Sequence, residues 1–209
     1  MTSRVWGGTT LDARRDARRE RLLEVGFELL GEQGSAAVTV RSVCRHAKLT
    51  DRYFYESFAD RDELLVAVYD RVGEQARQVL ADAVVAVAGP AVEPETVARA
   101  AVEAFVRLLT SDPRKGRVLL LAPMTDATLS ARALSLQPMF GELIRAQLAH
   151  RTTAELARQL TASALIGALS NLFVRWLDGT LGVTEQQLTD YCVRLVVHAV
   201  PLAGEQDRP

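Results

Sequence analysis

An all-α fold is the structure that this 209-residue sequence predicts. Apolar residues recur every three or four positions along most of the chain, which is the period of a helix with one buried face. No segment shows the sustained alternation that a half-buried strand requires. Proline, glycine and capping residues divide the chain into about nine helical segments. We therefore expect a group of short N-terminal helices followed by a larger helical unit.

The first predicted helix runs from about Asp12 to Gln33, and glycine follows it. A second, short helix begins after Thr39, which is a suitable N-cap. Thr50 caps a third helix that ends near Ser57 or Phe58. The second helix has its small apolar residues at the i, i+3, i+4 and i+7 spacing of a single buried stripe, namely Val40, Val43, Cys44 and Ala47.

Six further helices are predicted after this group. A proline at the first turn and a Thr or Asp followed three residues later by Glu or Gln are both typical of helix starts. Glycine ends several of the segments, as in the Gly89-Pro90 pair. The start signals, in chain order, are Asp60 with Glu63, Pro94, Asp112-Pro113, Thr128, Thr152 with Glu155, and Thr184 with Gln187.

Three consecutive aromatic residues, Tyr53, Phe54 and Tyr55, distinguish the third helix. No helix can turn three consecutive side chains toward one core. Phe54 and Phe58 are four residues apart and can pack inward together, so Tyr53 and Tyr55 must point elsewhere. Two short helices joined by a tight turn and packed on a longer one form a helix-turn-helix, whose second helix reads the major groove of DNA. The sequence therefore predicts that residues 50–53 face base edges.

Residues 20–65 resemble the DNA-binding domain of the tetracycline-repressor (TetR) family of bacterial regulators. The resemblance rests on the order and spacing of "LLEVGFELLGEQG", "VTVRSVCRHAKLT", "YFYESF" and "RDELL". Beyond Val72 it rests on the number of helices and on "RWLDG". It implies a helix-turn-helix DNA-binding domain at residues 1–60, of which 1–11 form an arm, and an effector-binding and dimerisation domain at residues 61–209.

The resemblance also implies a set of DNA contacts. Thr39, Arg41 and Tyr55 would contact phosphates. Arg61 would do so together with the N-terminal amides of the fourth predicted helix. The residues at the start of the third helix would face bases or the adjacent backbone. The full predicted set is Thr39, Arg41, Lys48, Thr50, Asp51, Arg52, Tyr53, Tyr55, Ser57 and Arg61.

Two of these positions depart from the family pattern. Lys48 occupies a turn position where the family usually has glycine, and a left-handed backbone would cost lysine roughly 1 kcal/mol. Either the turn differs, or a phosphate contact by Lys48 offsets the strain. Ser57 replaces a larger residue. The arginines of "DARRDARRER" either form an ordinary solvated helix face or add sequence-independent attraction to DNA.

The last two predicted helices are candidates for a dimer interface, because helix-turn-helix domains gain affinity and specificity by pairing on a near-palindrome. These helices have more apolar surface than one buried stripe needs. The alternative is that the same residues form only the core of one subunit. The predicted interface residues are Leu165, Leu169, Leu172, Phe173, Trp176, Tyr191, Leu195 and His198.

A ligand cavity within the larger helical unit is a further implication of the resemblance. Few charges fall on the inner faces of these helices, which favours an uncharged or amphipathic hydrophobic effector. Ligand binding would favour a dimer whose reading helices are wrongly spaced. The predicted cavity residues are Phe105, Arg107, Leu109, Met124, Met139, Phe140 and Asn171.

Composition narrows the remaining possibilities. The net charge of −1 argues against nonspecific coating of nucleic acid, and no apolar run suggests a membrane span. The two cysteines fall among apolar neighbours, which is typical of buried thiols in a reducing cytoplasm, and the histidines show no metal spacing. We expect no cofactor and no catalysis. Three hypotheses remain: a ligand-responsive cytoplasmic repressor, an activator of the same fold, and an all-α carrier or enzyme.

Overall fold

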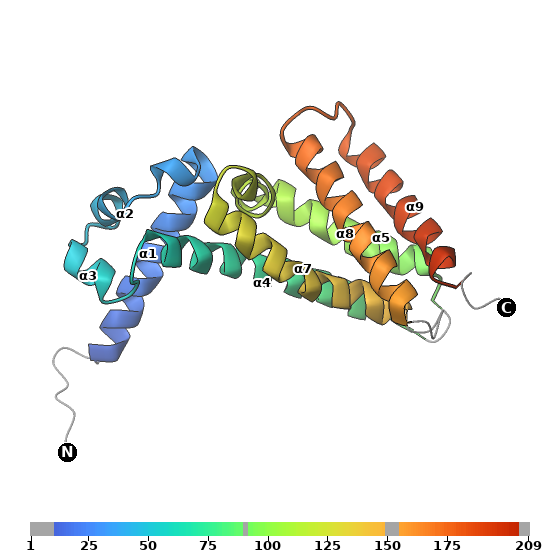
Figure 1. Ribbon diagram of the computed structural model, residues 1–209, viewed down its shortest axis with the longest axis horizontal. Helices are drawn as coiled ribbons and strands as arrows, with labels where there is room; N and C mark the ends of the chain where they lie inside the picture. The colour runs from blue at the N-terminus through green and yellow to red at the C-terminus, as the bar shows by residue number, and fades with distance from the viewer. Residues whose placement is uncertain (1–10, 90–91, 149–154, 205–209) are drawn as a thin grey trace, which may run out of the picture.

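The computed structural model describes residues 11–89, 92–148 and 155–204, and these ranges contain helices and no strand (Figure 1). The all-α prediction is therefore confirmed. Two short irregular helices, η2 (Arg117–Leu121, a π-helix) and η3 (Ala122–Met124), separate α6 from α7, and a 3-10 turn, η1 (Ser35–Ala37), follows α1. The α-helices are α1 (Leu11–Gln33), α2 (Val40–Ala47), α3 (Asp51–Tyr55), α4 (Arg61–Val87), α5 (Pro94–Ser111), α6 (Pro113–Gly116), α7 (Ala127–Leu148), α8 (Glu155–Leu177) and α9 (Glu185–Gly204).

The molecule is elongated, with α1, α2 and α3 gathered at one end (Figure 1). Helix α4 runs from this end along much of the length of the molecule, and α7 packs against it. Helices α8 and α9 lie side by side at the other end and pack against α7 and α5, respectively. Helix α4 is thus the element that joins the two ends.

Local capping signals explain most of the helix starts. Thr184 and Gln187 form the predicted reciprocal cap of α9, with N–H to side-chain oxygen distances of 2.9 and 3.2 Å. Asp60 accepts from the backbone N–H of Glu63 at 2.8 Å, as expected for the start of α4. The Glu63 carboxylate, however, accepts from the N–H of Ala59 rather than from that of Asp60.

The third helix is shorter than the sequence predicted. Thr50 occupies its N-cap position, but the Thr50 hydroxyl makes no capping hydrogen bond. Regular helix ends at Tyr55, and a turn leads to Phe58, so the expected end near Ser57 or Phe58 was too late. The predicted reciprocal cap at Thr152 and the end of the seventh predicted helix near Arg151 lie outside the described residues.

Two hydrophobic cores stabilise the chain. The first contains buried residues of α1, α2, α3 and the first half of α4, and it continues into η2 and the start of α7. The second core lies between α5, α8 and α9. The first core therefore crosses the boundary between residues 60 and 61 that the sequence suggested for two domains. A movement of α4 or η2 cannot leave the packing of the helix-turn-helix unchanged, because protein cores are close-packed.

Helix α8 is the described helix that is long and apolar enough to cross a membrane, with a mean hydropathy of 1.4 in its 18-residue window. Length and composition alone are weak evidence for a membrane span, because a packing helix passes the same test. Only 22% of that window is buried. Two leucines in its first turns, Leu156 and Leu160, are 64% and 56% exposed. This apolar face lacks a partner among the described residues of the subunit.

Candidate nucleic-acid interface and ligand cavity

Helix α3 divides its aromatic residues between the core and the surface. Phe54 and Phe58 are 0% and 1% exposed, and their ring centroids lie 5.8 Å apart. Tyr53 and Tyr55 are 37% and 59% exposed. The inward packing that the sequence predicted for Phe54 is thus confirmed, and it fixes which side of the helix faces outward.

The first turn of α3 presents a polar surface to solvent. Thr50, Asp51, Arg52 and Tyr53 are all exposed. The Arg52 side chain is 84% exposed and forms an ion pair with Glu56 at 3.2 Å. An exposed pair of this kind contributes about 0.3–0.5 kcal/mol, so another anion can replace Glu56 at little cost. The segment predicted to meet base edges is therefore accessible in the free protein.

Arginines of α1 hold the C-terminal end of α3. Arg15 donates to the backbone carbonyl of Glu56 at 2.8 Å, and Arg19 donates to the carbonyl of Ser57 at 3.0 Å. The Arg18 guanidinium lies 4.4 Å from the centre of the Tyr53 ring. These cations satisfy carbonyls that the helix end leaves unpaired. These arginines thus also contact the third helix and the turn after it, a role that the sequence did not predict.

The turn between α2 and α3 keeps the left-handed backbone that glycine usually provides. Lys48 has φ 56° and ψ 41°, and its N–H bonds to the Arg45 carbonyl at 3.3 Å. It is the one residue other than glycine with positive φ in the described ranges. The alternative that this turn differs is therefore wrong. Lys48 is exposed next to the start of α3.

Replacing Lys48 with glycine is expected to affect stability and DNA affinity in opposite directions. Glycine relieves the left-handed strain, which should raise the free energy of unfolding by about 0.5–1 kcal/mol after its greater unfolded-state entropy is included. Loss of the charge should weaken DNA binding. It should also reduce the salt slope, which is the slope of the logarithm of the binding constant against the logarithm of the salt concentration, by about one unit. Urea unfolding and fluorescence anisotropy would measure the two effects. Lys48→Asn is the matched control, since it removes the charge but tolerates the turn.

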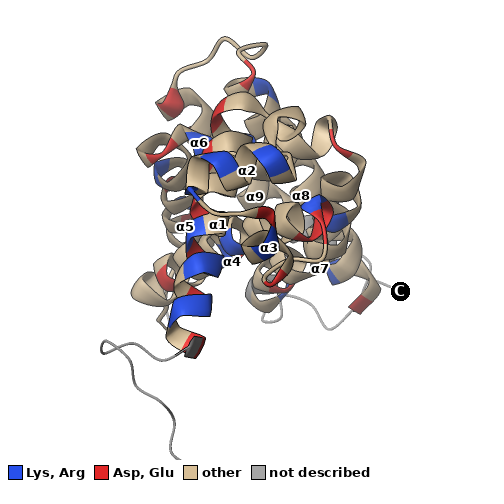
Figure 2. Ribbon diagram, turned by 90° about the vertical axis from the view of Figure 1, so that its left-hand side faces the viewer, with Lys and Arg blue, Asp and Glu red and all other residues tan. Residues whose placement is uncertain are grey.

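Helix α2 supplies the other predicted phosphate contacts. Arg41 is exposed and forms no ion pair within the described part of the chain. Basic residues of α2 and α1 appear together on the end of the molecule that faces the viewer in Figure 2, with acidic residues between them. The Thr39 hydroxyl belongs to the N-terminal cap of α2, where it accepts from the N–H of Ser42 at 3.1 Å. The same hydroxyl donates to the Ser42 hydroxyl at 3.1 Å, so a phosphate contact by Thr39 would replace this bond.

Two predicted DNA contacts are unavailable in this structure. The Ser57 hydroxyl oxygen is buried and has no hydrogen-bond partner, so Ser57 does not present it to a phosphate. Arg61 was expected to reach DNA from the start of α4. Its guanidinium instead donates to the carbonyl oxygens of Val38 and Ser35, at 2.7 and 2.8 Å. Arg61 is thus engaged by the segment that precedes α2.

The same guanidinium connects this segment to the start of α7. Arg61 bonds to Asp126 at 3.1 Å, immediately before α7, and to Asp62 at 2.7 Å. Burial alone raises the pKa of the Asp126 carboxyl, but the Leu129 N–H and the Arg61 guanidinium more than offset this and hold the pKa below its ordinary value. A lowered folded-state pKa means that Asp126 stabilises the fold at neutral pH, and this stabilisation is lost as pH falls through the folded pKa.

Substitutions at Arg41 and Arg61 are expected to have different consequences. Arg41→Ala should leave the melting temperature nearly unchanged and reduce the salt slope of DNA binding by about one unit. Arg61→Ala should lower the free energy of unfolding by about 1–3 kcal/mol, because it leaves two carbonyls and the Asp126 carboxylate without their donor. Its salt slope should equal that of the wild type. The salt slope would be measured by anisotropy across a salt series. A reduced slope in the Arg61 variant would mean that Arg61 does contact a phosphate.

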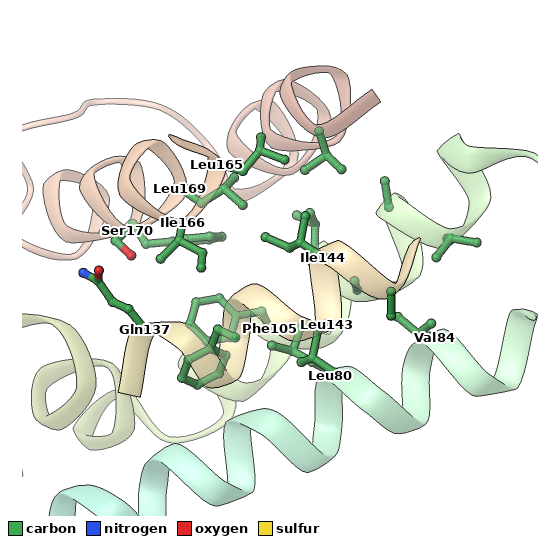
Figure 3. Close-up of a pocket in the computed structure, with 18 of the residues that line it drawn as sticks. Leu80, Val84, Phe105, Gln137, Leu143, Ile144, Leu165, Ile166, Leu169 and Ser170 are labelled. Carbon is green, nitrogen blue, oxygen red and sulfur yellow. The ribbon is translucent and has the colours of Figure 1, made fainter. Parts of the chain in front are cut away.

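A cavity of about 800 Å³ lies between α4, α5, α7, α8 and α9 (Figure 3). Its lining is mostly Leu, Val, Ile, Ala and Phe, with Tyr69, Gln137 and Ser170 as its polar side chains. No Asp, Glu, Lys, Arg or His is present in the described lining. Segments η2 and η3 contribute Leu120 and Pro123, so the cavity extends to the elements that adjoin the helix-turn-helix.

Of the predicted cavity residues, Phe105 and Phe140 line this space. The others lie elsewhere, because neighbouring helices determine which face of each helix is turned inward. Leu109 is in the second core, Met139 is half-buried outside the lining, and Met124 is 66% exposed. The two polar residues expected to orient a ligand, Arg107 and Asn171, are both exposed.

Sequence reasoning missed Gln137 and Ser170. Gln137 lies in α7 between the lining residues Leu136 and Phe140, and Ser170 lies in α8 next to Leu169. Their only signal in the sequence is a polar residue within an apolar stretch. A solvent-facing residue in the same stretch gives the same signal, so the register of the helix had to be known first.

The predicted interface residues fall into two groups. Leu165 and Phe173 are 2% and 3% exposed and line the cavity within one subunit. Tyr191 is 52% exposed and His198 is also exposed. The remaining residues are half-buried, namely Leu169, Leu172, Trp176 and Leu195.

Both cysteines are free thiols. Cys44 and Cys192 are buried, as the sequence predicted, and burial raises the pKa of each to about 11. The Asp51 carboxylate adds to the shift at Cys44. Both thiols therefore stay protonated and unreactive at neutral pH. No cluster of potential metal ligands occurs among the residues that the structure describes.

An exposed α3 held on a buried aromatic pair, preceded by α2 and a tight turn, defines a helix-turn-helix DNA-binding protein. Residues 22–68 match the family model described as "Bacterial regulatory proteins, tetR family". This match identifies residues 22–68 as the DNA-binding domain of a TetR-type transcriptional regulator.

Solved structures share the fold over almost the whole chain. A TetR-like transcriptional regulator from Rhodococcus sp. RHA1 is 21% identical, with a TM-score of 0.65, and the match covers 88% of this chain and 96% of that one. The fatty acid degradation regulator FadR from Bacillus halodurans is 14% identical, with a TM-score of 0.68 and coverage of 86% and 94%. The multidrug binding protein EbrR, complexed with imidazole, is 22% identical, with a TM-score of 0.64 and coverage of 85% and 94%.

Proposed function

We propose that this protein is a ligand-responsive repressor that binds a near-palindromic operator as a homodimer and leaves it when a small hydrophobic effector enters the cavity. Residues 1–60 form the DNA-binding domain in this proposal, and residues 61–209 bind the effector and the second subunit. Residues 50–53 and Tyr55 meet the operator through α3, with Thr39, Arg41 and Lys48 on flanking phosphates.

One observation carries the proposal: the elements that line the cavity also hold the helix-turn-helix. Helix α4 contributes Leu80 and Val84 to the cavity, and its first residue, Arg61, binds the segment before α2. Segment η2 lines the cavity as well, and its first residue, Arg117, donates to the Gly31 carbonyl of α1 at 3.2 Å. A ligand that shifts α4 or η2 therefore moves the reading helix.

The contact between α1 and α6 adds to this connection. A Cβ atom built on Gly31 would lie 2.5 Å from the Cβ of Arg114, so the two helices approach as closely as glycine allows. Arg114 also lies above the Phe27 ring at 5.1 Å and pairs with Glu32 at 3.5 Å. Because the two helices are so closely packed, a movement of α6 would displace α1 as well. A coupling of about 1–3 kcal/mol between the two sites is enough for regulation.

Dimerisation is supported by the exposed face of α8 and α9. Leu156, Leu160 and Tyr191 are more than half exposed, which is unusual for three large apolar side chains on two adjacent helices. A second copy that packs its own α8 and α9 on this face would bury them by two-fold symmetry. The pair would then present two copies of α3 to half-sites about one turn of DNA apart.

The proposal is tested with labelled DNA from upstream of the protein's own gene. Fluorescence anisotropy should detect salt-dependent binding, and a compound that raises the melting temperature should also release the DNA. Arg52→Ala should change the ranking of operator variants and not weaken all of them equally, because base contacts specify and phosphate contacts position. Absence of binding to any upstream fragment would reject the proposal in favour of an all-α carrier.

The same contacts could serve an activator, because the direction of regulation depends on where the operator lies relative to the promoter. A reporter fused to the bound promoter separates the two. Expression should rise when the regulator is deleted if it is a repressor, and should fall if it is an activator. The apolar lining and the relative described as a multidrug binding protein both support the ligand-sensing part of the proposal.

A further inference from the structure

The polar groups of the cavity are concentrated at one end. Figure 3 shows the Gln137 amide and the Ser170 hydroxyl next to each other, with Ile144 near the middle of the view and Val84 toward the opposite side. Neither polar side chain has a hydrogen-bond partner in the described part of the chain. Gln137 is exposed and Ser170 is half-buried in the subunit, and both side chains can therefore hydrogen-bond to a ligand in the cavity.

The remaining polar side chain of the lining is already committed. The Tyr69 hydroxyl donates to the Leu119 carbonyl at 3.3 Å. Burial raises the pKa of this hydroxyl to about 12, so it stays neutral at every physiological pH. Tyr69 therefore provides neither a charge nor a free donor, and the hydrogen-bonding capacity of the cavity resides in Gln137 and Ser170.

The described lining contains no ionised side chain, so a charged ligand finds no counter-charge within the cavity; Glu142 and Arg145 lie beside Gln137, outside the lining. A carboxylate or an ammonium group transferred from water into an apolar site without a counter-charge loses several kcal/mol of solvation. An amide and a hydroxyl each offer both a donor and an acceptor, and they recognise a neutral carbonyl or hydroxyl group well. The cavity thus favours one uncharged polar group on an otherwise apolar molecule.

We infer that the effector is a neutral, elongated amphiphile with a single alcohol, ketone, lactone or ester group, which binds between Gln137 and Ser170 while its hydrocarbon part extends along α4 and α7 toward Val84 and Ile144. This inference rests on the ligand-responsive function proposed above and specifies the chemical class of the ligand. It separates such molecules from fatty acid anions and from amphiphilic cations of the same length.

The test compares ligands of matched chain length with the full-length protein and without DNA. Calorimetric titration at pH 7.5 would use 1-decanol, methyl decanoate, sodium decanoate and decyltrimethylammonium. The neutral pair should bind at least about 100-fold more tightly than the ions. Decanoate should gain affinity as the pH falls toward the pKa of its carboxyl group, because the protonated acid is neutral. Equal affinity for decanol and decanoate at pH 7.5 would overturn the inference.

Two substitutions test the position of the polar group. Gln137→Leu and Ser170→Ala should each weaken decanol and methyl decanoate by about threefold to tenfold, the effect of one lost hydrogen bond. Ser163→Ala is the matched control, since it removes a hydroxyl from the same helix outside this cavity. Circular dichroism melting verifies folding. Unchanged affinity in both variants would show that the head group lies elsewhere and would contradict the inference.

Operator release is measured separately, with the same ligands added to the protein–DNA complex. If the neutral ligands bind in the expected order and the complex survives, the ligand assignment stands and the proposed release mechanism is wrong. If none of the four ligands binds the free protein, the ligand assignment is wrong, while DNA binding by α3 is unaffected. The two claims therefore fail independently.

Discussion

Replacing Phe54 with alanine is expected to destabilise the protein by about 3–5 kcal/mol, the usual cost of removing a buried phenylalanine. Phe54 is 0% exposed and packs against Phe58 at 5.8 Å between ring centroids. Helix α3 has only five residues and cannot be stable without this anchor. Urea unfolding monitored by circular dichroism should give the loss directly, and operator binding should disappear because the reading helix is no longer held in place.

The adjacent Tyr55 provides the control for this experiment. Its side chain is 59% exposed, so Tyr55→Ala should change the free energy of unfolding by about 1 kcal/mol or less. If Tyr55 donates to a phosphate, the same variant should bind DNA about tenfold more weakly. The two substitutions should therefore differ in effect: Phe54→Ala lowers the free energy of unfolding, whereas Tyr55→Ala lowers mainly the DNA affinity. Equal destabilisation by both substitutions would mean that α3 is packed differently from this structure.

Introducing a charge at Leu160 is expected to have the second large effect. Leu160 is 56% exposed on α8, in the face that we propose as the dimer interface. Glutamate there would be buried without a partner in the dimer, and this should shift the protein to monomers at micromolar concentration. Sedimentation velocity measures the shift. Operator affinity should fall by about 10²–10⁴-fold, because each half-site then binds without the effective concentration that its linked partner provides.

Val85→Glu is the matched control for Leu160→Glu. Val85 is 73% exposed on α4, outside the α8 and α9 face, so the same charge should leave both the sedimentation coefficient and the operator affinity unchanged. A dimeric Leu160→Glu protein with full affinity would move the interface away from α8. A wild-type protein that sediments as a monomer at micromolar concentration would reject the dimer itself.

The sequence predicted secondary structure well because its signals act within a few residues. Thr184 and Gln187 are three residues apart, and the cap that they form depends on nothing else in the chain. Phe54 and Phe58 are four residues apart, so helical geometry alone turns them to one side. Lys48 was the one turn residue with two interpretations, and only the observed φ of 56° decided between them.

The predicted cavity and interface residues fared less well, because their roles depend on which helix packs against which. Leu165 and Phe173 were expected at the dimer interface and instead line the cavity within one subunit. Met124 and Asn171 were expected in the cavity and are exposed. An apolar residue on a helix indicates that another element covers it, but the sequence does not show which element that is.

By itself, the sequence determined the helices, the helix-turn-helix and the inward direction of Phe54, since each follows from contacts between residues close together in the chain. Tertiary structure alone decided the roles of the arginines. Apart from the adjacent Asp62, the partners of Arg61 lie 23, 26 and 65 residues away, and those of Arg15 and Arg19 lie 41 and 38 residues away. A long cationic side chain binds whichever carbonyl or carboxylate the folded chain brings within about 3 Å. That choice exists only once the helices have packed.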